Sequence, residues 1–164
     1  MSKLIMIRGN SASGKTSVAK ELQHRIGRNT LLIPQDMVRR EMLYANDGCD
    51  SPAVSLISEL VRYGHKNCDV TILEGILFSG YYKPVFDTVI ETFGSDVFAY
   101  YYDIPFEETM KRHMTRNKRF EFGEAEMREW WAEKDYIGFI EEKKLGMELT
   151  LEKTVEMIYS EVIG

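Results

Sequence analysis

The sequence predicts an α/β fold with three layers, in which helices cover both faces of a mostly parallel five-stranded sheet. Short apolar or β-branched runs alternate along the chain with segments of helical periodicity. This alternation is typical of βαβ units, whose strands pair in parallel. The chain has 164 residues, which is enough for one well-buried core and too few to expect two, so we predict a single domain over residues 1–164.

Each element follows from its local pattern. Strands are predicted where apolar runs occur, at residues 3–8, 30–34, 69–74 and 96–103, with a short last strand near 145–149. Helices are predicted where apolar residues recur every three or four positions, at residues 14–27, 36–45, 52–67, 81–93, 105–116, 123–135 and 150–163. Gly27 is placed to end the first helix, and Ser51 before Pro52 suits a helix start.

A glycine-rich loop joins the first strand to the first helix. It reads G-x-x-x-x-G-K-T and consists of Gly9, Asn10, Ser11, Ala12, Ser13, Gly14, Lys15 and Thr16. In such a loop the glycines let backbone N–H groups surround a polyphosphate, and the helix N-terminus adds partial positive charge. The lysine reaches the outer phosphates and the threonine hydroxyl can bind Mg²⁺. We therefore expect residues 9–17, including Ser17, to bind a nucleotide and Thr16 to hold magnesium.

Charged residues follow the second and third strands, at the edge of the sheet where ligands bind in open parallel sheets. Asp36 can accept the proton of an attacking hydroxyl, or it can serve only as a helix cap. Arg39 lies one helical turn further on and is preferred over Arg40 for contacting a substrate. Glu74 is placed to hold magnesium through water or to orient the substrate, or it lies in a solvent-facing turn.

A basic cluster follows the fourth strand. Arg112 and Arg116 share one helical face, and Lys118 and Arg119 follow after Asn117. Phosphoryl transfer needs positive charge over the transferred group, so we predict a mobile lid at about residues 112–124 that carries Arg112 and Arg116 to the site. The alternative is a basic face that only contacts solvent.

Other residues in the same region have structural interpretations. We expect His113 at the surface, and we expect one of Trp130 and Trp131 in the core while the other forms an apolar wall for substrate. Aromatic residues elsewhere, at 81–82 and 100–102, are assigned chiefly to core and sheet packing.

Composition excludes several classes of protein. A formal net charge of −5 gives no overall attraction to nucleic acid. No apolar stretch approaches the roughly 20 residues of a membrane span. The first apolar run of the chain is too short for a signal peptide, so we expect a cytoplasmic protein. The two cysteines and three histidines lack the spacing of a disulfide framework or a metal site, so both thiols are expected to be reduced.

The chain resembles small phosphate-loop (P-loop, Walker A) kinases of the group that includes polynucleotide 5′-hydroxyl kinases, chloramphenicol phosphotransferase and the zeta toxins. The resemblance covers about residues 3–120 and rests on the loop, on an Asp-x-x-Arg pair at Asp36 and Arg39, and on the segment from Asp103 to Arg116. It extends to a subgroup of uncharacterised bacterial kinases. It implies the P-loop NTPase fold, Asp36 as general base, Thr16 as magnesium ligand, and Arg112 and Arg116 as lid cations.

Two positions depart from the pattern of that group. Ala12 stands where a further loop glycine is frequent, and Glu74 replaces the aspartate often found after the third strand. The second departure argues against direct binding of magnesium by Glu74.

Loop, base and lid together predict an enzyme that transfers the γ-phosphoryl group of ATP, with Mg²⁺, to a hydroxyl of a small molecule. A nucleoside, nucleotide, sugar or antibiotic would serve as acceptor, and the sequence does not choose among them. Two alternatives stay open, an ATP-binding regulatory NTPase module and a polynucleotide 5′-hydroxyl kinase.

Overall fold

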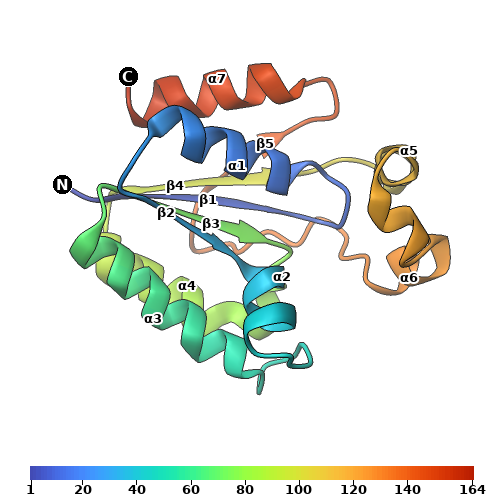
Figure 1. Cartoon of the computed structure of the whole chain (residues 1–164), viewed down its shortest axis with the longest axis horizontal. Helices are drawn as coiled ribbons and strands as arrows, with labels where there is room; N and C mark the ends of the chain where they lie inside the picture. Colours follow the sequence, from blue (N-terminus) through green and yellow to red (C-terminus); the bar gives the residue numbers. More distant parts are fainter.

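The computed structural model describes all 164 residues and has a five-stranded sheet at its centre (Figure 1). The strand order is β2-β3-β1-β4-β5, and every neighbouring pair is parallel. The predicted fold class is therefore confirmed. The strand bounds are β1 Lys3–Gly9, β2 Thr30–Pro34, β3 Val70–Gly75, β4 Val97–Tyr102 and β5 Glu142–Leu145.

Helices cover both faces of the sheet. Figure 1 shows α1 (Lys15–Ile26) and α7 (Leu151–Val162) on one face, and α3 (Pro52–Asn67) and α4 (Ser79–Phe93) on the other. The remaining helices lie beyond the carboxyl ends of the strands: α2 Gln35–Met37, the π-helical η1 Val38–Met42, α5 Phe106–Met114, the 3₁₀ helix η2 Asn117–Phe120 and α6 Glu124–Glu129. No helix is long and apolar enough to cross a membrane.

Local signals in the sequence place most helix ends correctly. The Ser51 hydroxyl accepts a hydrogen bond from the backbone N–H of Ala53 at 3.2 Å, and Pro52 takes the first position of α3, as predicted. Gly27 follows the end of α1 with a φ of 105°, a conformation that other residues rarely adopt.

The central strand β1 packs against a core on each side. Ile5 and Ile7 face a cluster that includes Leu22 of α1, whereas Leu4 and Met6 face a cluster that includes Phe86 of α4. Residues 4–9 of the strand are buried, which explains why its sequence is a continuous apolar run and does not alternate with polar residues.

The last strand differs from its prediction. We expected it at 145–149, and it lies at Glu142–Leu145, paired with Ala99–Tyr102 of β4. Its first three residues are charged, so no apolar run marks it. The strand forms at the sheet edge, where two side chains stay in solvent and the Glu142 carboxylate is drawn into the protein by a buried arginine.

Two helices are shorter than predicted. The helix expected over 123–135 ends at Glu129, because the side chain of Asn10 binds the backbone of Ala132 in both directions, donating to its carbonyl and accepting from its N–H at 2.8 Å each. The helix expected over 36–45 ends at Met42, after a π turn in which Leu43 N–H donates to the Val38 carbonyl at 3.1 Å.

A network around Arg8 ties these parts together. The Arg8 side chain is fully buried and donates to Asp135 and Glu142, at 2.7 Å each, and to the carbonyl of Leu77 at 3.0 Å. Its guanidinium also lies 5.3 Å from the ring centre of Phe86. One cation on β1 therefore holds β5, the start of α4 and the segment after α6.

We expect Arg8→Met to lower the free energy of unfolding by about 3–5 kcal/mol, because the carboxylate of Glu142 would stay buried without its partner. Urea unfolding followed by circular dichroism measures this. The control is Arg62→Met, whose ion pair with Glu59 is exposed and contributes about 1 kcal/mol or less. An equal loss in the two variants would contradict a structural role for the buried network.

Candidate active site

The loop between β1 and α1 has an uncapped helix N-terminus at its end. No side chain caps α1, and its first turn holds no acidic residue, so backbone N–H groups remain free to bind an anion. Gly14 turns the chain with a φ of 109°. Ala12, which departs from the pattern of the kinases that the sequence resembles, has a φ of 64°, a left-handed conformation that costs a non-glycine residue about 1 kcal/mol.

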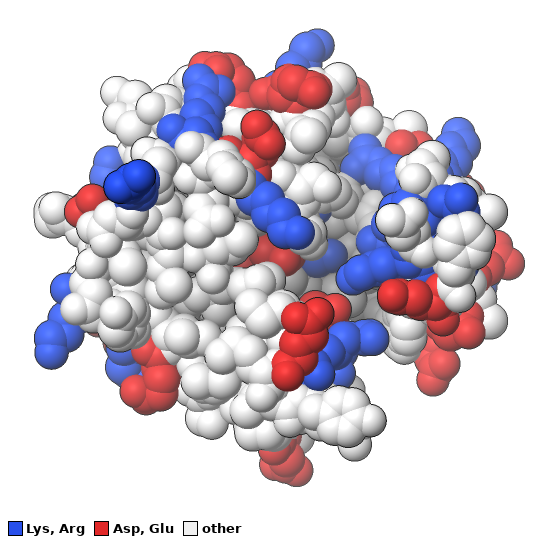
Figure 2. All heavy atoms as spheres, viewed as in Figure 1, with Lys and Arg blue, Asp and Glu red and all other residues white.

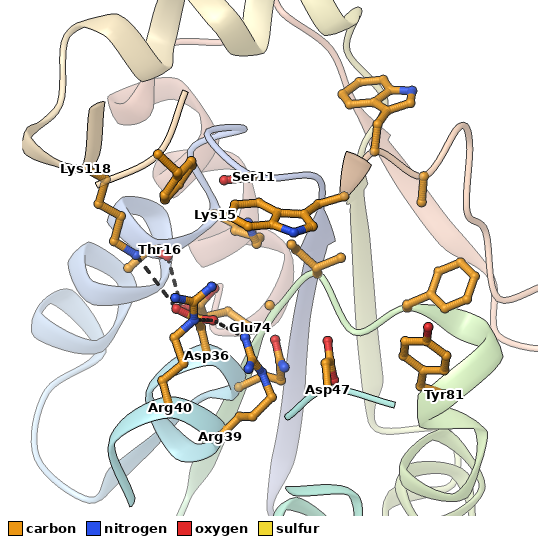
Figure 3. Close-up of a pocket in the computed structure, with 18 of the residues that line it drawn as sticks. Ser11, Lys15, Thr16, Asp36, Arg39, Arg40, Asp47, Glu74, Tyr81 and Lys118 are labelled. Carbon is orange, nitrogen blue, oxygen red and sulfur yellow. Dashed lines mark hydrogen bonds and ion pairs between the residues drawn. The ribbon is translucent and has the colours of Figure 1, made fainter. Parts of the chain in front are cut away.

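Lys15 points into this loop (Figure 3). Its side chain is buried, and Nζ donates to the Asn10 carbonyl at 3.1 Å. Burial lowers the pKa of the Lys15 ammonium to about 8, and the nearby charge of Glu74 opposes that shift. A bound polyphosphate would supply the anionic partner that this buried ammonium lacks.

Glu74 lies on β3, beside the loop. The parallel pairing of β1 and β3 puts it opposite Ile7, two residues before the loop begins. It is only 3% exposed and accepts a hydrogen bond from the Thr16 hydroxyl at 3.2 Å. Burial raises the pKa of Glu74. The solvent-facing turn that we gave as an alternative is therefore wrong, and Glu74 lies beside the predicted magnesium ligand.

Asp36 lies in the first turn of α2, among three cations. Its carboxylate is 3.2 Å from Arg39, 2.8 Å from Arg40 and 3.8 Å from Lys118 of the lid. No side chain caps α2, so the alternative of Asp36 as a helix cap is not observed. Arg39 is the more buried of the two arginines, with a side chain 15% exposed against 49% for Arg40, although both contact Asp36.

The lid predicted at about residues 112–124 corresponds to the end of α5, η2 and the first residue of α6. In Figure 2, Lys and Arg side chains crowd the side of the lid that faces the body of the protein. Arg116 donates to the Ser11 hydroxyl at 3.0 Å, and Arg112 donates to the Ser13 carbonyl. The basic cluster thus contacts the phosphate loop directly, and the alternative of a face that contacts only solvent does not describe these two arginines.

His113 is buried, so its predicted place at the surface is wrong. Its ring stacks on Phe122 with centres 4.7 Å apart, Nε2 lies 2.7 Å from the Phe122 carbonyl, and Nδ1 accepts from Arg116 at 3.1 Å. The lid folds back on itself and forms a small core of its own. The charged neighbours of His113 in the sequence suggest an exposed residue, because the contact with Phe122, nine positions away, leaves no local pattern.

The two tryptophans also differ from their prediction. Neither lies in the core: Trp130 is 38% exposed, Trp131 is half-buried, and both line the same cavity. The short α6 places them on the turn that follows it, where Asn10 holds the backbone of Ala132.

A cavity of about 560 Å³ joins the loop, α2, the end of β3 and the lid. Among the predicted site residues it brings together Ser11, Lys15, Thr16, Asp36, Arg39, Glu74 and Arg116. Arg112 does not line it, and neither do Gly9, Asn10, Ala12, Ser13, Gly14 and Ser17. Lys118 of the predicted basic cluster also lines it, whereas sequence reasoning gave no site role to other lining residues, namely Gln35, Asp47, Ile76, Phe78, Tyr81, Phe122, Glu129 and Ala132.

The residues present fit a nucleotide polyphosphate. The N-terminus of α1 is uncapped, and the buried ammonium group of Lys15, the first residue of that helix, lines the cavity. These groups are donors, as phosphate oxygens require. The Thr16 hydroxyl next to a carboxylate is an oxygen donor set that suits Mg²⁺.

Solved structures of two kinases and of one resistance protein share this architecture. A gluconokinase from Sinorhizobium meliloti 1021 superposes with a TM-score of 0.68 at 14% identity, covering 98% of this chain and 91% of that one. The tunicamycin resistance protein of Deinococcus radiodurans superposes with a TM-score of 0.65 at 16% identity, covering 99% of this chain and 96% of that one. The APS kinase of Mycobacterium tuberculosis, solved with AMPPNP and APS, superposes with a TM-score of 0.60 at 17% identity, covering 97% of this chain and 96% of that one.

The chain has the fold of the P-loop kinases. No protein-family model matches the chain, and no curated protein matches it by sequence. At these identities the solved structures establish the fold alone, so the activity has to be argued from the site.

We expect Lys15→Ala to weaken binding of an ATP analogue by roughly 10²-fold or more, because the loop loses its buried cation. Calorimetric titration measures this affinity. The control is Lys20→Ala, which removes an exposed lysine from the same helix. Unchanged affinity in Lys15→Ala would exclude the loop as the nucleotide site.

Proposed function

We propose that this protein is an ATP-dependent kinase that phosphorylates a hydroxyl group of a small molecule. One observation carries the proposal: Lys15 and Thr16 of the loop, the carboxylate of Asp36 and the lid cations Arg116 and Lys118 all line one cavity. Phosphoryl transfer needs this combination of a phosphate cradle, a proton acceptor and mobile positive charge.

Each residue has a role in the proposed reaction. The acceptor oxygen forms a bond to the γ-phosphorus of ATP, the bond from that phosphorus to the bridging oxygen breaks, and the hydroxyl proton passes to Asp36. Lys15 and the free N–H groups of α1 bind the phosphates. Thr16 would hold Mg²⁺, which would supply positive charge to the phosphates. Arg116 stabilises the negative charge of the transferred phosphoryl group. We extend the predicted lid from residues 112–124 to Trp131, because Trp130 and Trp131 line the same cavity. These two side chains would exclude water from it.

Similar proteins support the assignment. The fold is shared with a gluconokinase and an APS kinase, and the Asp-x-x-Arg pair, the loop and the lid arginines resemble those of the polynucleotide kinase, chloramphenicol phosphotransferase and zeta toxin group. We assign the chain to that group on these residues.

A phosphate-transfer screen tests the proposal. Radiolabelled ATP and Mg²⁺ are offered with nucleosides, sugars, aminoglycosides and oligonucleotide 5′ ends, and products are separated from free phosphate. Transfer to a soluble acceptor supports a small-molecule kinase. Slow hydrolysis without transfer to any acceptor would favour a regulatory NTPase, and transfer only to oligonucleotides would favour a polynucleotide kinase.

We expect Asp36→Asn to lower acceptor phosphorylation by roughly 10²-fold or more while ATP binding stays normal, because the amide keeps the shape but cannot take the proton. Stability should change by no more than about 1 kcal/mol, since Asp36 is half-exposed and caps no helix. Asp87→Asn, in an exposed pair with Lys83, is the control. Transfer at the wild-type rate would mean that another group, with Glu74 the first candidate, accepts the proton.

Arg116→Ala should lower kcat by about 10²-fold and change the affinity for ATP less, because the lid charge acts mainly on the transferred phosphoryl group. Arg112→Ala should act more weakly on kcat, since Arg112 braces the loop and does not line the cavity. Arg119→Ala is a control within the same lid. Steady-state kinetics at saturating acceptor separate these effects, and full activity of the Arg112→Ala, Arg116→Ala double variant would exclude a catalytic lid.

A further inference from the structure

Arg116 reaches the cavity from a segment outside the helices of the lid. α5 ends at Met114, and the backbone of Arg116 is extended, with φ −115° and ψ 160°, before η2 begins at Asn117. Arg116 therefore does not share a helical face with Arg112, as its spacing predicted. It nevertheless lines the cavity, and its Nη2 donates to the Ser11 hydroxyl of the phosphate loop at 3.0 Å. Since no helical turn directs this side chain, its direction depends on contacts with other side chains.

His113 is the residue that holds the Arg116 side chain from within the lid. Arg116 Nε donates to His113 Nδ1 at 3.1 Å, and an arginine N–H group can only donate. Nδ1 therefore carries the lone pair of a neutral imidazole, and the proton is on Nε2. Nε2 lies 2.7 Å from the carbonyl of Phe122, which can only accept. The two hydrogen bonds thus assign the same tautomer.

Phe122 fixes the plane of the imidazole. The two rings stack with centres 4.7 Å apart and an angle of 18° between their planes, and His113 is buried. The Phe122 ring also lies 5.6 Å from the guanidinium carbon of Arg116 and packs edge-on against Trp130. A ring held by packing on one face and by a hydrogen bond at Nε2 presents Nδ1 to Arg116 in one direction.

This partner leaves the positive charge of Arg116 uncompensated. Arg116 bonds to an imidazole and a hydroxyl, forms no ion pair with a carboxylate, and has no partner within the protein at Nη1. Arg112, by contrast, is paired with Glu108 at 3.2 Å and does not line the cavity. A carboxylate would neutralise part of the charge that the transferred phosphoryl group needs, whereas a neutral imidazole orients the guanidinium and leaves that charge available.

We propose that His113 is a positioning residue for phosphoryl transfer, which holds the Arg116 guanidinium toward the phosphate loop through Nδ1. His113 itself does not line the cavity, so its effect on the reaction passes through Arg116. The inference rests on the proposed kinase function, in which Arg116 stabilises the transferred group.

Two amide variants separate the role of Nδ1 from that of Nε2. Asparagine places its amide oxygen near the position of Nδ1 and accepts from Arg116, whereas glutamine places its amide nitrogen near the position of Nε2 and donates to the Phe122 carbonyl. We expect His113→Gln to lower kcat by about tenfold and to change the KM for ATP by less than about threefold, because one hydrogen bond that orients a charge is lost. His113→Asn should restore most of the wild-type kcat.

Stability is the readout that a merely structural role would move. Both variants lose the stacking on Phe122, so thermal unfolding should shift by similar amounts in the two proteins. The control is His24→Gln, at an exposed position of α1, which should leave kcat unchanged. An unchanged kcat in His113→Gln, or an equal loss of kcat in His113→Gln and His113→Asn, would overturn the inference.

Variants of Arg116 test the same coupling from the other side. In an Arg116→Ala background, His113→Gln should lower kcat no further, and an additional loss of about tenfold would contradict action through Arg116. Arg116→Lys leaves His113 in place and keeps the charge but lacks the Nε–H group. Its kcat should fall nearly as far as that of Arg116→Ala, and a wild-type kcat would show that the charge needs no orientation by His113.

A mimic of the transferred group separates this inference from the kinase function. ADP with Mg²⁺ and tetrafluoroaluminate binds without an acceptor, and its affinity is measured by calorimetry. His113→Gln should weaken this binding by about tenfold and His113→Asn should not, since the mimic depends on the orientation of Arg116. That difference without transfer to any acceptor would refute the kinase function and support the positioning role. Equal affinity of the two variants and the wild type for the mimic would overturn the positioning role.

Discussion

The buried guanidinium of Arg8 is the interaction on which the architecture of the cavity depends. It lies on β1, immediately before the phosphate loop, and it bonds to Asp135, Glu142 and the Leu77 carbonyl. Asp135 in turn accepts hydrogen bonds from Ser79 at the start of α4. The segments that carry Phe78 and Trp131 are therefore both held by hydrogen bonds to Arg8 and Asp135. A buried ion pair contributes geometry more than net stability, because desolvation offsets much of the attraction.

A second tie runs through the loop itself. Asn10 is a loop residue by its position in the motif, yet its side chain binds Ala132 and does not line the cavity. Through Asn10 and Arg8, β1 and its loop both hold the segment that follows α6. Hydrogen bonds from one strand and its loop thus fix the position of the phosphate loop relative to the segment that carries Trp131.

The charged groups that line the cavity include a buried pair and a more exposed cluster around Asp36. The Lys15 ammonium and the Glu74 carboxylate are both buried. Burial lowers the pKa of Lys15 and raises the pKa of Glu74, so both shifts favour the neutral form of the side chain. Nearer the lid, one carboxylate, Asp36, is shared by Arg39, Arg40 and Lys118. Asp36 therefore joins η1, which carries the two arginines, to η2, which carries Lys118.

The sequence by itself determined four of the five strands, most of the helices and the phosphate loop, because each depends on neighbouring residues: apolar runs for β1 and β3, Ser51 and Pro52 for the start of α3, and G-x-x-x-x-G-K-T for the loop. It also singled out Asp36, Arg39, Glu74 and Arg116, since residues that end parallel strands or begin the lid meet at one sheet edge. Only the tertiary structure decided the place of β5, the early end of α6, the burial of His113 and the hydrogen bonds that join Gln35, Tyr82 and Asp47. Each depends on a side chain that finds a hydrogen-bond or ion-pair partner outside its own helix or strand, nine positions away for His113 and much further for the others. Such pairings leave no local periodicity, so no pattern of neighbouring residues predicts them.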